Sequence, residues 1–291
     1  MRVDYPIVDA HQHFWDVDQP DYAWLEREPD AIRRTFGFDD LRPHLQASGV
    51  GRTVLVQAAD TASDTDAMLR LADAHPQIAG VVAYVPLEQP AVAEPQLAEL
   101  MHTGRVCGIR NLIHDQPDPD WLRRPDVADG LALLEARDVP FDLVAVLPRH
   151  LEYAQYLSER FPDLRIVIDH LAKPPVGTDR REPWQVLMRA AAENPNVYAK
   201  VSGLYPVPGA GSAATAEQLR PWLDTALSLF GPDRLMFGSD WPVAVAYGDY
   251  EQVVGTLVEL VTGYGADVAR AILADTATGF YRLTPEREAG R

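Results

Sequence analysis

Two histidines near the start of the chain, His11 and His13, are separated by a single residue. On an extended segment, residues two apart direct their side chains to the same side. This spacing suits two ligands on one metal ion, or two hydrogen-bond donors on one substrate oxygen. Packed or capping histidines are the alternative interpretation, but the pair ends an apolar run just before Phe14 and Trp15, which favours a functional site.

Asp240 follows the apolar run Leu235–Gly238 and is followed by Trp241 and Pro242. A carboxylate at such a position is partly removed from water, so we expect a raised pKa and a role as general base. The alternative is an aspartate that stabilises the loop through an Asx turn.

Two further polar residues close apolar runs. His170 follows Ile166–Asp169, and an imidazole there can donate to a carbonyl or bind a metal. Arg110 ends Val106–Arg110, where a guanidinium can hold a carboxylate or a polarised carbonyl. The simpler alternatives are a turn-capping histidine and a salt bridge at the rim. Asp169 is expected to point the opposite way from His170 and to anchor the loop.

Other polar residues lie close to these. Asp142 and Lys200 fall on predicted strands and are expected to contact the substrate or to support the residues that do. Tyr22, Trp24 and His114 lie in predicted loops, where hydroxyl and N–H donors and ring faces can contact a polyol.

The elements that must position these residues alternate regularly along the chain. Apolar, β-branched runs alternate with segments of helical spacing, which predicts an α/β fold with repeated βα units on a parallel sheet. We expect a (β/α)₈ barrel of the TIM type, whose reactive side chains gather where the strands end. A length of 291 residues suits a single domain over residues 1–291. The eight predicted strands are Ile7–Ala10, Thr53–Gln57, Ile78–Val85, Val106–Arg110, Phe141–Val144, Ile166–Asp169, Val197–Val201 and Leu235–Gly238.

Two loops are long enough to cover the mouth of such a barrel. Phe14–Phe38 is rich in aromatic and charged residues, and Leu204–Ala214 is rich in Gly, Pro and Ala. We expect them to act as lid and specificity segments. The last helical pattern falls at Asp267–Asp275.

Composition excludes several partners. With 26 Lys+Arg against 43 Asp+Glu, the net charge of −17 would repel nucleic acid and an anionic membrane surface. No apolar stretch is long enough to span a bilayer, and no signal peptide is evident. A single cysteine, Cys107, excludes an internal disulfide, so a cytoplasmic location is expected. The oligomeric state is left open, a homo-oligomer included.

With these residues placed, the chain closely resembles the amidohydrolase-related lactonases and, within them, the L-fuconolactonase-like group, nearly end to end. The resemblance implies a distorted (β/α)₈ barrel with His-x-His on the first strand, further metal ligands on the fourth to sixth strands and a catalytic aspartate on the eighth. The motifs that carry it are Asp9-Ala-His11-Gln-His13-Phe-Trp15, Asp40-Leu-Arg-Pro43, Gly108-Ile-Arg110, Phe141-Asp142-Leu, Asp169-His170-Leu-Ala-Lys-Pro174, Lys200-Val-Ser-Gly203 and Phe237-Gly-Ser-Asp240-Trp-Pro242.

Two positions depart from the binuclear-metal pattern of the wider superfamily. Arg110 stands where a lysine or carboxylate able to bridge metals is expected, and Asp142 stands where a histidine ligand is expected. A guanidinium cannot ligate a cation, which argues against two metals. This is similar to the lactonase branch, whose members can work without a metal. We therefore expect no required cofactor, and an optional or adventitious Zn²⁺ would be held by His11, His13, His170 and Asp240.

The hypothesis that follows is a hydrolase that opens a sugar-acid lactone, a carboxylic ester, to the aldonate. Asp240 would activate water, and four donors would hold the carbonyl oxygen as it becomes an oxyanion, namely His170, Arg110, His11 and His13. Two alternatives stay open. One is a mononuclear metal-dependent hydrolase or decarboxylase, and the other is a catalytically silent sugar-binding barrel. The sequence does not distinguish sugars or 1,4- from 1,5-lactones.

Overall fold

The computed structural model describes residues 3–206 and 213–284. Its centre is one eight-stranded sheet in which every strand pairs in parallel with the next along the chain. This arrangement confirms the predicted (β/α)₈ barrel. The strands are β1 (Ile7–Gln12), β2 (Val50–Val56), β3 (Ile78–Ala83), β4 (Val106–Arg110), β5 (Phe141–Leu143), β6 (Ile166–Ile168), β7 (Val197–Val201) and β8 (Leu235–Phe237).

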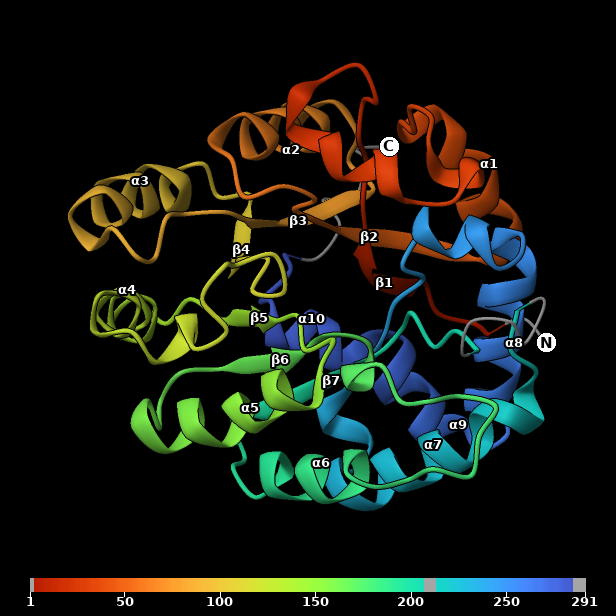
Figure 1. Cartoon of the computed structure of the whole chain (residues 1–291). Helices are drawn as coiled ribbons and strands as arrows, with labels where there is room; N and C mark the ends of the chain where they lie inside the picture. Colours follow the sequence, from red (N-terminus) through yellow and green to blue (C-terminus); the bar gives the residue numbers. More distant parts are fainter. Residues whose placement is uncertain (1–2, 207–212, 285–291) are drawn as a thin grey trace.

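Helices surround the sheet on its outside, as Figure 1 shows. Buried on both faces, the strands are rich in Val, Ile and Leu, as parallel strands covered by helices are. Thr61 caps one helix by accepting a hydrogen bond from the backbone N–H of Asp64. The main helices are α1 (Phe38–Ser48), α2 (Ala62–Ala74), α3 (Pro90–His102), α4 (Pro125–Ala136), α5 (Pro148–Arg160), α6 (Trp184–Ala192), α7 (Ala216–Phe230) and α8 (Tyr250–Thr262).

The barrel nearly closes between β1 and β8. Gln12 and Trp241 form one bridge across this seam. Just beyond the strand ends, the backbone N–H of His13 donates to the Trp241 carbonyl at 2.7 Å, and that of Asp240 donates to the His11 carbonyl at 2.8 Å. The seam therefore brings the His-x-His pair directly beside Asp240.

The C-terminal segment differs from the expected single helix at Asp267–Asp275. It forms α9 (Ala266–Arg270), a wider π-helical turn (Ala271–Asp275) and α10 (Thr276–Phe280). Phe280, Tyr281 and neighbouring apolar residues pack against barrel residues from β1, β2, β3, β6 and β8. This segment therefore closes part of the barrel interior.

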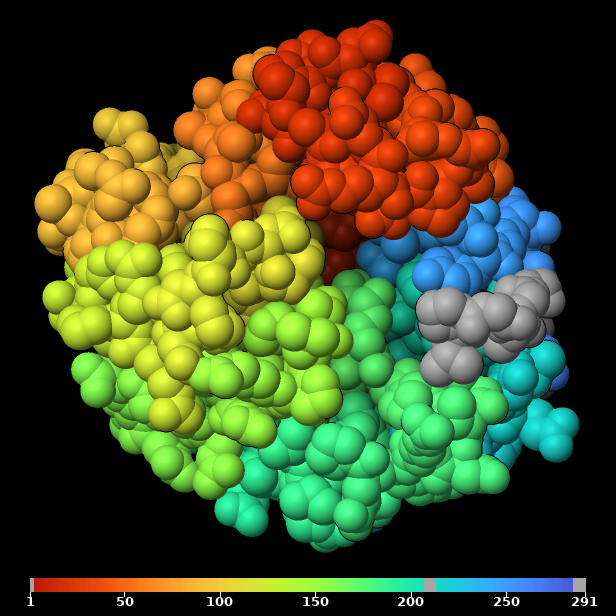
Figure 2. Space-filling model, in the orientation of Figure 1, coloured from red at the N-terminus to blue at the C-terminus, as the bar shows by residue number. Residues whose placement is uncertain are grey.

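The predicted lid Phe14–Phe38 carries two short 3₁₀ helices, Pro20–Arg27 and Asp30–Ile32. Aromatic rings fix it to the barrel, because Phe36 makes edge contacts with both Trp15 and Trp241. Of the other predicted lid, Leu204–Ala214, residues 207–212 lie outside the described part of the chain. Figure 2 shows the face of the molecule hollowed at its centre, with dark red atoms of the N-terminal part at the base. Among the described residues, no helix has both the length and the apolar character needed to cross a bilayer.

Candidate active site

The hollow is a cavity of about 260 Å³. Its walls come from loops that follow β1, β2, β4, β5, β6 and β8, so it lies where active sites lie in barrels of this type. The lining residues are His13, Trp15, Trp24, Arg27, Glu28, Ala58, Arg110, Leu112, His114, Asp115, Val144, Val146, His170, Lys173, Asp240 and Val243.

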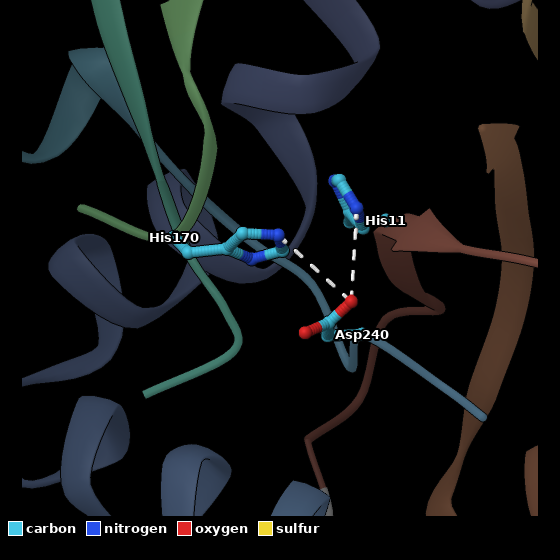
Figure 3. A group of neighbouring side chains, drawn as sticks. All are labelled: His11, His170 and Asp240. Atoms are coloured by element: carbon cyan, nitrogen blue, oxygen red, sulfur yellow. Dashed lines mark ion pairs between the residues drawn. The ribbon is translucent and has the colours of Figure 1, made fainter. Parts of the chain in front are cut away.

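One oxygen of Asp240 faces three imidazoles. Its Oδ1 lies 3.8 Å from Nε2 of His11, 3.7 Å from Nε2 of His13 and 3.9 Å from Nε2 of His170. Figure 3 shows His11 and His170 approaching Asp240 from different elements. The structure thus brings three of the predicted catalytic residues, His11, His13 and His170, around the carboxylate of a fourth, Asp240.

The other oxygen of Asp240 has two partners that the sequence did not suggest. The Tyr205 hydroxyl donates to Oδ2 at 3.1 Å, and Nζ of Lys173 lies 3.6 Å from the same oxygen. Gly203 makes room for this contact, because a Cβ at that position would lie 2.7 Å from Oδ2 and 2.5 Å from Nδ1 of His170. Gly203 also has a φ of +54°, which favours glycine.

The expected rise in the pKa of Asp240 is wrong. Burial does raise it, but attraction to His170 and Lys173 outweighs burial and holds the pKa of Asp240 well below its usual range. The aromatic neighbours of Asp240 are adjacent in sequence, whereas the groups that stabilise the carboxylate come from a distant part of the chain. Asp240 is therefore ionised at neutral pH, although the same low pKa makes it a weaker base than an ordinary aspartate.

Hydrogen bonds to the other ring nitrogens set the protonation of the histidines. Nδ1 of His13 lies 2.7 Å from the Val56 carbonyl, which can only accept, so Nδ1 carries the hydrogen. Nδ1 of His170 lies 2.9 Å from Oγ of Ser202. Burial lowers the pKa of His170 to about 3 and that of His11 well below its usual range. In a neutral His13, Nε2 therefore presents a lone pair to the site and cannot donate to an oxyanion.

The guanidinium of Arg110 is held in place by hydrogen bonds to other protein groups. Nη1 donates to Asp169 Oδ2 at 3.0 Å and lies 3.4 Å from Nε2 of His11. Nη2 donates to the Gln57 carbonyl. Arg110 still lines the cavity, but Nη1 and Nη2 each already donate one hydrogen bond, and Nε is buried with no partner among the described residues.

Beneath the cavity lies a buried charge network. Nζ of Lys200 lies 2.5 Å from Asp142 Oδ2, 3.0 Å from Asp169 Oδ1 and 3.1 Å from Nδ1 of His11. The Tyr281 hydroxyl donates to Asp142 at 2.7 Å. Lys200, Asp142 and Asp169 are fully buried, so their charges are balanced by one another and by Arg110.

This network changes three expectations. Asp142 and Lys200 do not line the cavity, so the structure gives no support for direct substrate contact by either. Asp169 points toward the barrel interior, opposite to the expectation. Because β6 ends at Ile168, the two-residue alternation of a strand no longer applies to Asp169.

His170 and Lys173 belong to a left-handed turn. His170, Leu171, Ala172 and Lys173 have φ values of 57°, 48°, 56° and 49°. The N–H of Lys173 donates to the His170 carbonyl at 2.8 Å and closes the turn. A run of non-glycine residues in this conformation is strained and is retained where the surroundings enforce it, often at functional sites. The turn brings both side chains to Asp240.

The remaining predicted contacts separate into two groups. Trp24 and His114 line the cavity as expected of substrate contacts. Tyr22 does not, because its hydroxyl donates to Asp64 at 2.7 Å and its side chain packs in the core. The Tyr22 phenol therefore fixes the lid segment to the start of α2.

The donor set fits one metal ion. Ligand atoms of His11, His170 and Asp240 lie within 4.8 Å of one another, and Nε2 of His13 is 3.0 Å from Nε2 of His11. Such convergence of nitrogens on a carboxylate is typical of a mononuclear site. Arg110 opposes it by directing an N–H toward the His11 nitrogen that would bind the ion. A second ion has no ligand at Asp142, which is paired with Lys200.

Comparison with known proteins gives consistent matches. The amidohydrolase family model matches residues 8–283. An L-fucono-1,5-lactonase of Burkholderia ambifaria is 38% identical over 95% of each chain, and one of Burkholderia multivorans is 35% identical over 87% of each. The crystal structure of an amidohydrolase from Burkholderia multivorans with bound zinc superimposes with a TM-score of 0.85 at 31% identity, covering 96% of this chain and 100% of that one.

Proposed function

The chain belongs to the amidohydrolase family, and from that membership we propose that it hydrolyses a sugar lactone to the open aldonate, as a carboxylic ester hydrolase. The observation that carries the proposal is the ionised carboxylate of Asp240 at the wall of a small cavity. Ester hydrolysis without a covalent intermediate needs a base of this kind beside the bound carbonyl.

Asp240 performs the proton transfers. Its carboxylate takes a proton from a water molecule, whose oxygen forms a bond to the lactone carbonyl carbon as the carbonyl electron pair moves onto oxygen. When that pair returns, the bond to the ring oxygen breaks and the protonated Asp240 gives its proton to the leaving alkoxide. The new carboxylic acid loses its proton to solvent.

Arg110 stabilises the developing charge as one donor to the carbonyl oxygen. It lines the cavity and is held rigidly by Asp169 and the Gln57 carbonyl, so it needs little reorganisation during reaction. His11, His13 and His170 surround one oxygen of the base at 3.7–3.9 Å without a hydrogen bond to it, which differs from the donor role expected from the sequence.

The substrate is proposed to be a single sugar ring of the L-fucono-1,5-lactone type, which is what the curated Burkholderia relatives are named for. A cavity of about 260 Å³ suits one sugar ring better than an oligosaccharide. Trp24 and His114 can contact ring hydroxyls. The aliphatic residues Leu112, Val144 and Val146 offer a dry surface to an apolar part of the sugar.

Metal use is proposed to be optional. If Zn²⁺ binds, His11, His13, His170 and Asp240 would hold it, and it would polarise a carbonyl or acidify a water molecule. Arg110 and Lys173 already supply positive charge at the cavity, and Asp240 is ionised beside them. A cytoplasmic location stays a prediction from the sequence, which left the oligomeric state open.

The experiment is a pH-indicator assay of the purified protein against aldono- and uronolactones, including 1,4- and 1,5-lactones of L-fuconate. We expect acid release well above the spontaneous rate with at least one sugar lactone, and loss of that activity in Asp240→Asn. Absence of turnover together with measurable lactone binding would instead support a sugar-binding barrel.

A metal-dependent hydrolase or decarboxylase is the second candidate. It is favoured by the convergence of three imidazole Nε2 atoms on Asp240 Oδ1 and by the bound zinc in the similar crystal structure. Activity that is strictly proportional to bound metal, or release of CO₂ from an aromatic acid, would favour it over the lactonase.

A further inference from the structure

Lys173 is one of only two lysines in the 291-residue chain, and both lie at the active site. The other, Lys200, is fully buried in the network beneath the cavity. The Lys173 side chain is 32% exposed and lines the cavity, although it was not among the residues expected to act. An ammonium at this position calls for a functional explanation.

The residues around Lys173 leave its protons largely free. An ammonium has three N–H donors. Among the described residues, its closest ionic partner is Asp240 Oδ2 at 3.6 Å, which is beyond hydrogen-bond distance, and it also lies 5.1 Å from the ring centre of Tyr205. Lys173 therefore faces the cavity with donors available for a substrate.

Other candidate donors at the carbonyl are less available. Nδ1 of His13 is hydrogen-bonded to the Val56 carbonyl, so in the neutral ring Nε2 presents only a lone pair to the cavity. Arg110 already donates to Asp169 and to the Gln57 carbonyl. The Tyr205 hydroxyl donates to Asp240. A carbonyl oxygen that becomes negative in this cavity has Lys173 as its most available cationic donor.

The backbone supports the same assignment. The left-handed turn of residues 170–173 directs both side chains toward Asp240, His170 toward Oδ1 and Lys173 toward Oδ2. A surface lysine that served only solubility would not require four consecutive residues in a strained conformation.

Resting on the proposed lactone hydrolysis, we propose that Lys173 is a catalytic residue whose ammonium donates a hydrogen bond to the lactone carbonyl oxygen. As the water oxygen binds the carbonyl carbon, the electron pair displaced onto oxygen is stabilised by Lys173 without proton transfer. When the ring C–O bond breaks, the same ammonium pairs with an oxygen of the aldonate carboxylate. Lys173 thus acts together with Arg110, while Asp240 moves the protons.

The test compares Lys173→Met and Lys173→Arg with the wild type on the lactone that the wild type hydrolyses best. Lys173→Met should lower kcat on the order of 10²-fold with KM changed by less than about threefold, the usual result of losing one oxyanion donor. Lys173→Arg should recover part of the loss, because a guanidinium keeps the charge but not the shape. Arg180→Met is the matched control, since it removes an exposed cation seven residues further along the chain that does not line the cavity, and it should retain wild-type kcat.

Profiles of kcat against pH separate direct contact from an effect through Asp240. A donor to the substrate predicts a loss in Lys173→Met that persists across the pH plateau. A loss that disappears at higher pH would mean that Lys173 only keeps Asp240 ionised, and would overturn the proposal. Near-normal kcat in a Lys173→Met protein with a wild-type melting temperature would overturn it too. If the wild type hydrolyses no lactone, the proposed function fails and this inference fails with it.

Discussion

The carboxylate of Asp9 on β1 accepts a hydrogen bond at 2.8 Å from the backbone N–H of Ser239, which immediately precedes Asp240. The same oxygen accepts the N–H of His11 at 3.1 Å. One buried side chain therefore joins the two ends of the barrel at the seam where β1 and β8 share few backbone bonds. The position of the base relative to the His-x-His pair depends on this contact.

Asp9 should make stability depend on pH. Burial raises the pKa of Asp9 to about 6 from an ordinary value of 3.8, although hydrogen bonds from Ser239 and His11 oppose the rise. Because the folded state holds the proton more tightly, the contribution of Asp9 to stability falls as pH rises from about 4 to about 6, by about 3 kcal/mol at most. Asp9→Asn keeps an acceptor oxygen without the charge. The free energy of unfolding of Asp9→Asn, measured in urea, should therefore rise relative to that of the wild type between pH 4 and pH 7. The same difference between variant and wild type at both pH values would contradict this.

Asp240→Asn retains the shape of the side chain but removes the proton acceptor. Turnover of the preferred lactone should fall by roughly 10²-fold or more, with an unchanged circular dichroism spectrum. Steady-state kinetics with the pH-indicator assay measures this. A folded variant with near-normal kcat would show that another group activates water.

The low pKa of Asp240 has a kinetic consequence. A base whose pKa is held well below its usual 3.8 stays ionised through the mildly acidic range, so kcat/KM should be flat from about pH 5 to pH 7. The fall in kcat/KM should begin only at pH values below the usual pKa of a carboxylate. A rate that climbs with a midpoint near pH 6 would indicate a raised pKa or a different base.

Lys200→Met tests the buried network. The substitution leaves Asp142 and Asp169 without their shared cation, and removing one partner from a buried ionic group costs about 3–5 kcal/mol. We expect a correspondingly lower urea midpoint. The double variant Lys200→Met with Asp142→Asn should recover part of the lost stability. If the double variant were as unstable as Lys200→Met alone, the loss would come from packing and not from charge.

Chelation addresses the metal. Prolonged dialysis against a chelator, checked by metal analysis, should leave lactone hydrolysis largely intact, because Arg110 and Lys173 provide positive charge at the cavity. If chelation abolished activity and one equivalent of Zn²⁺ restored it, the main role of His11, His13 and His170 would be to bind the metal. That result would reject the metal-independent mechanism.

Most of the fold could be predicted because parallel strands covered by helices have a simple sequence pattern. All eight strands were expected, and their boundaries differ by a few residues, as at β3, which ends at Ala83 instead of Val85. The C-terminal segment was harder, since short apolar patterns do not distinguish one helix from the sequence of α9, a π-helical turn and α10. Strand ends also located Asp240, His170, Arg110 and the His-x-His pair.

The rest of the site depends on contacts between distant parts of the chain. The direction of the Asp240 pKa follows from Lys173 and His170, which a left-handed turn brings near it and which no periodicity predicts. Tyr205, 35 residues before Asp240, gives no signal of its own beyond lying in a predicted lid. Lys173 did carry one signal, the scarcity of lysine in the chain, which becomes informative once both lysines are located.

That scarcity determines how the protein responds to chemical attachment. Amine-reactive resins and dyes usually modify many surface lysines and leave an active site untouched. Here Lys200 is fully buried and Lys173 lies in the cavity. Such a reagent can therefore reach one lysine side chain, that of Lys173 beside Asp240, in addition to an α-amino group. Covalent immobilisation should therefore use carboxylate coupling or a fused tag, because amine coupling would block the cavity itself.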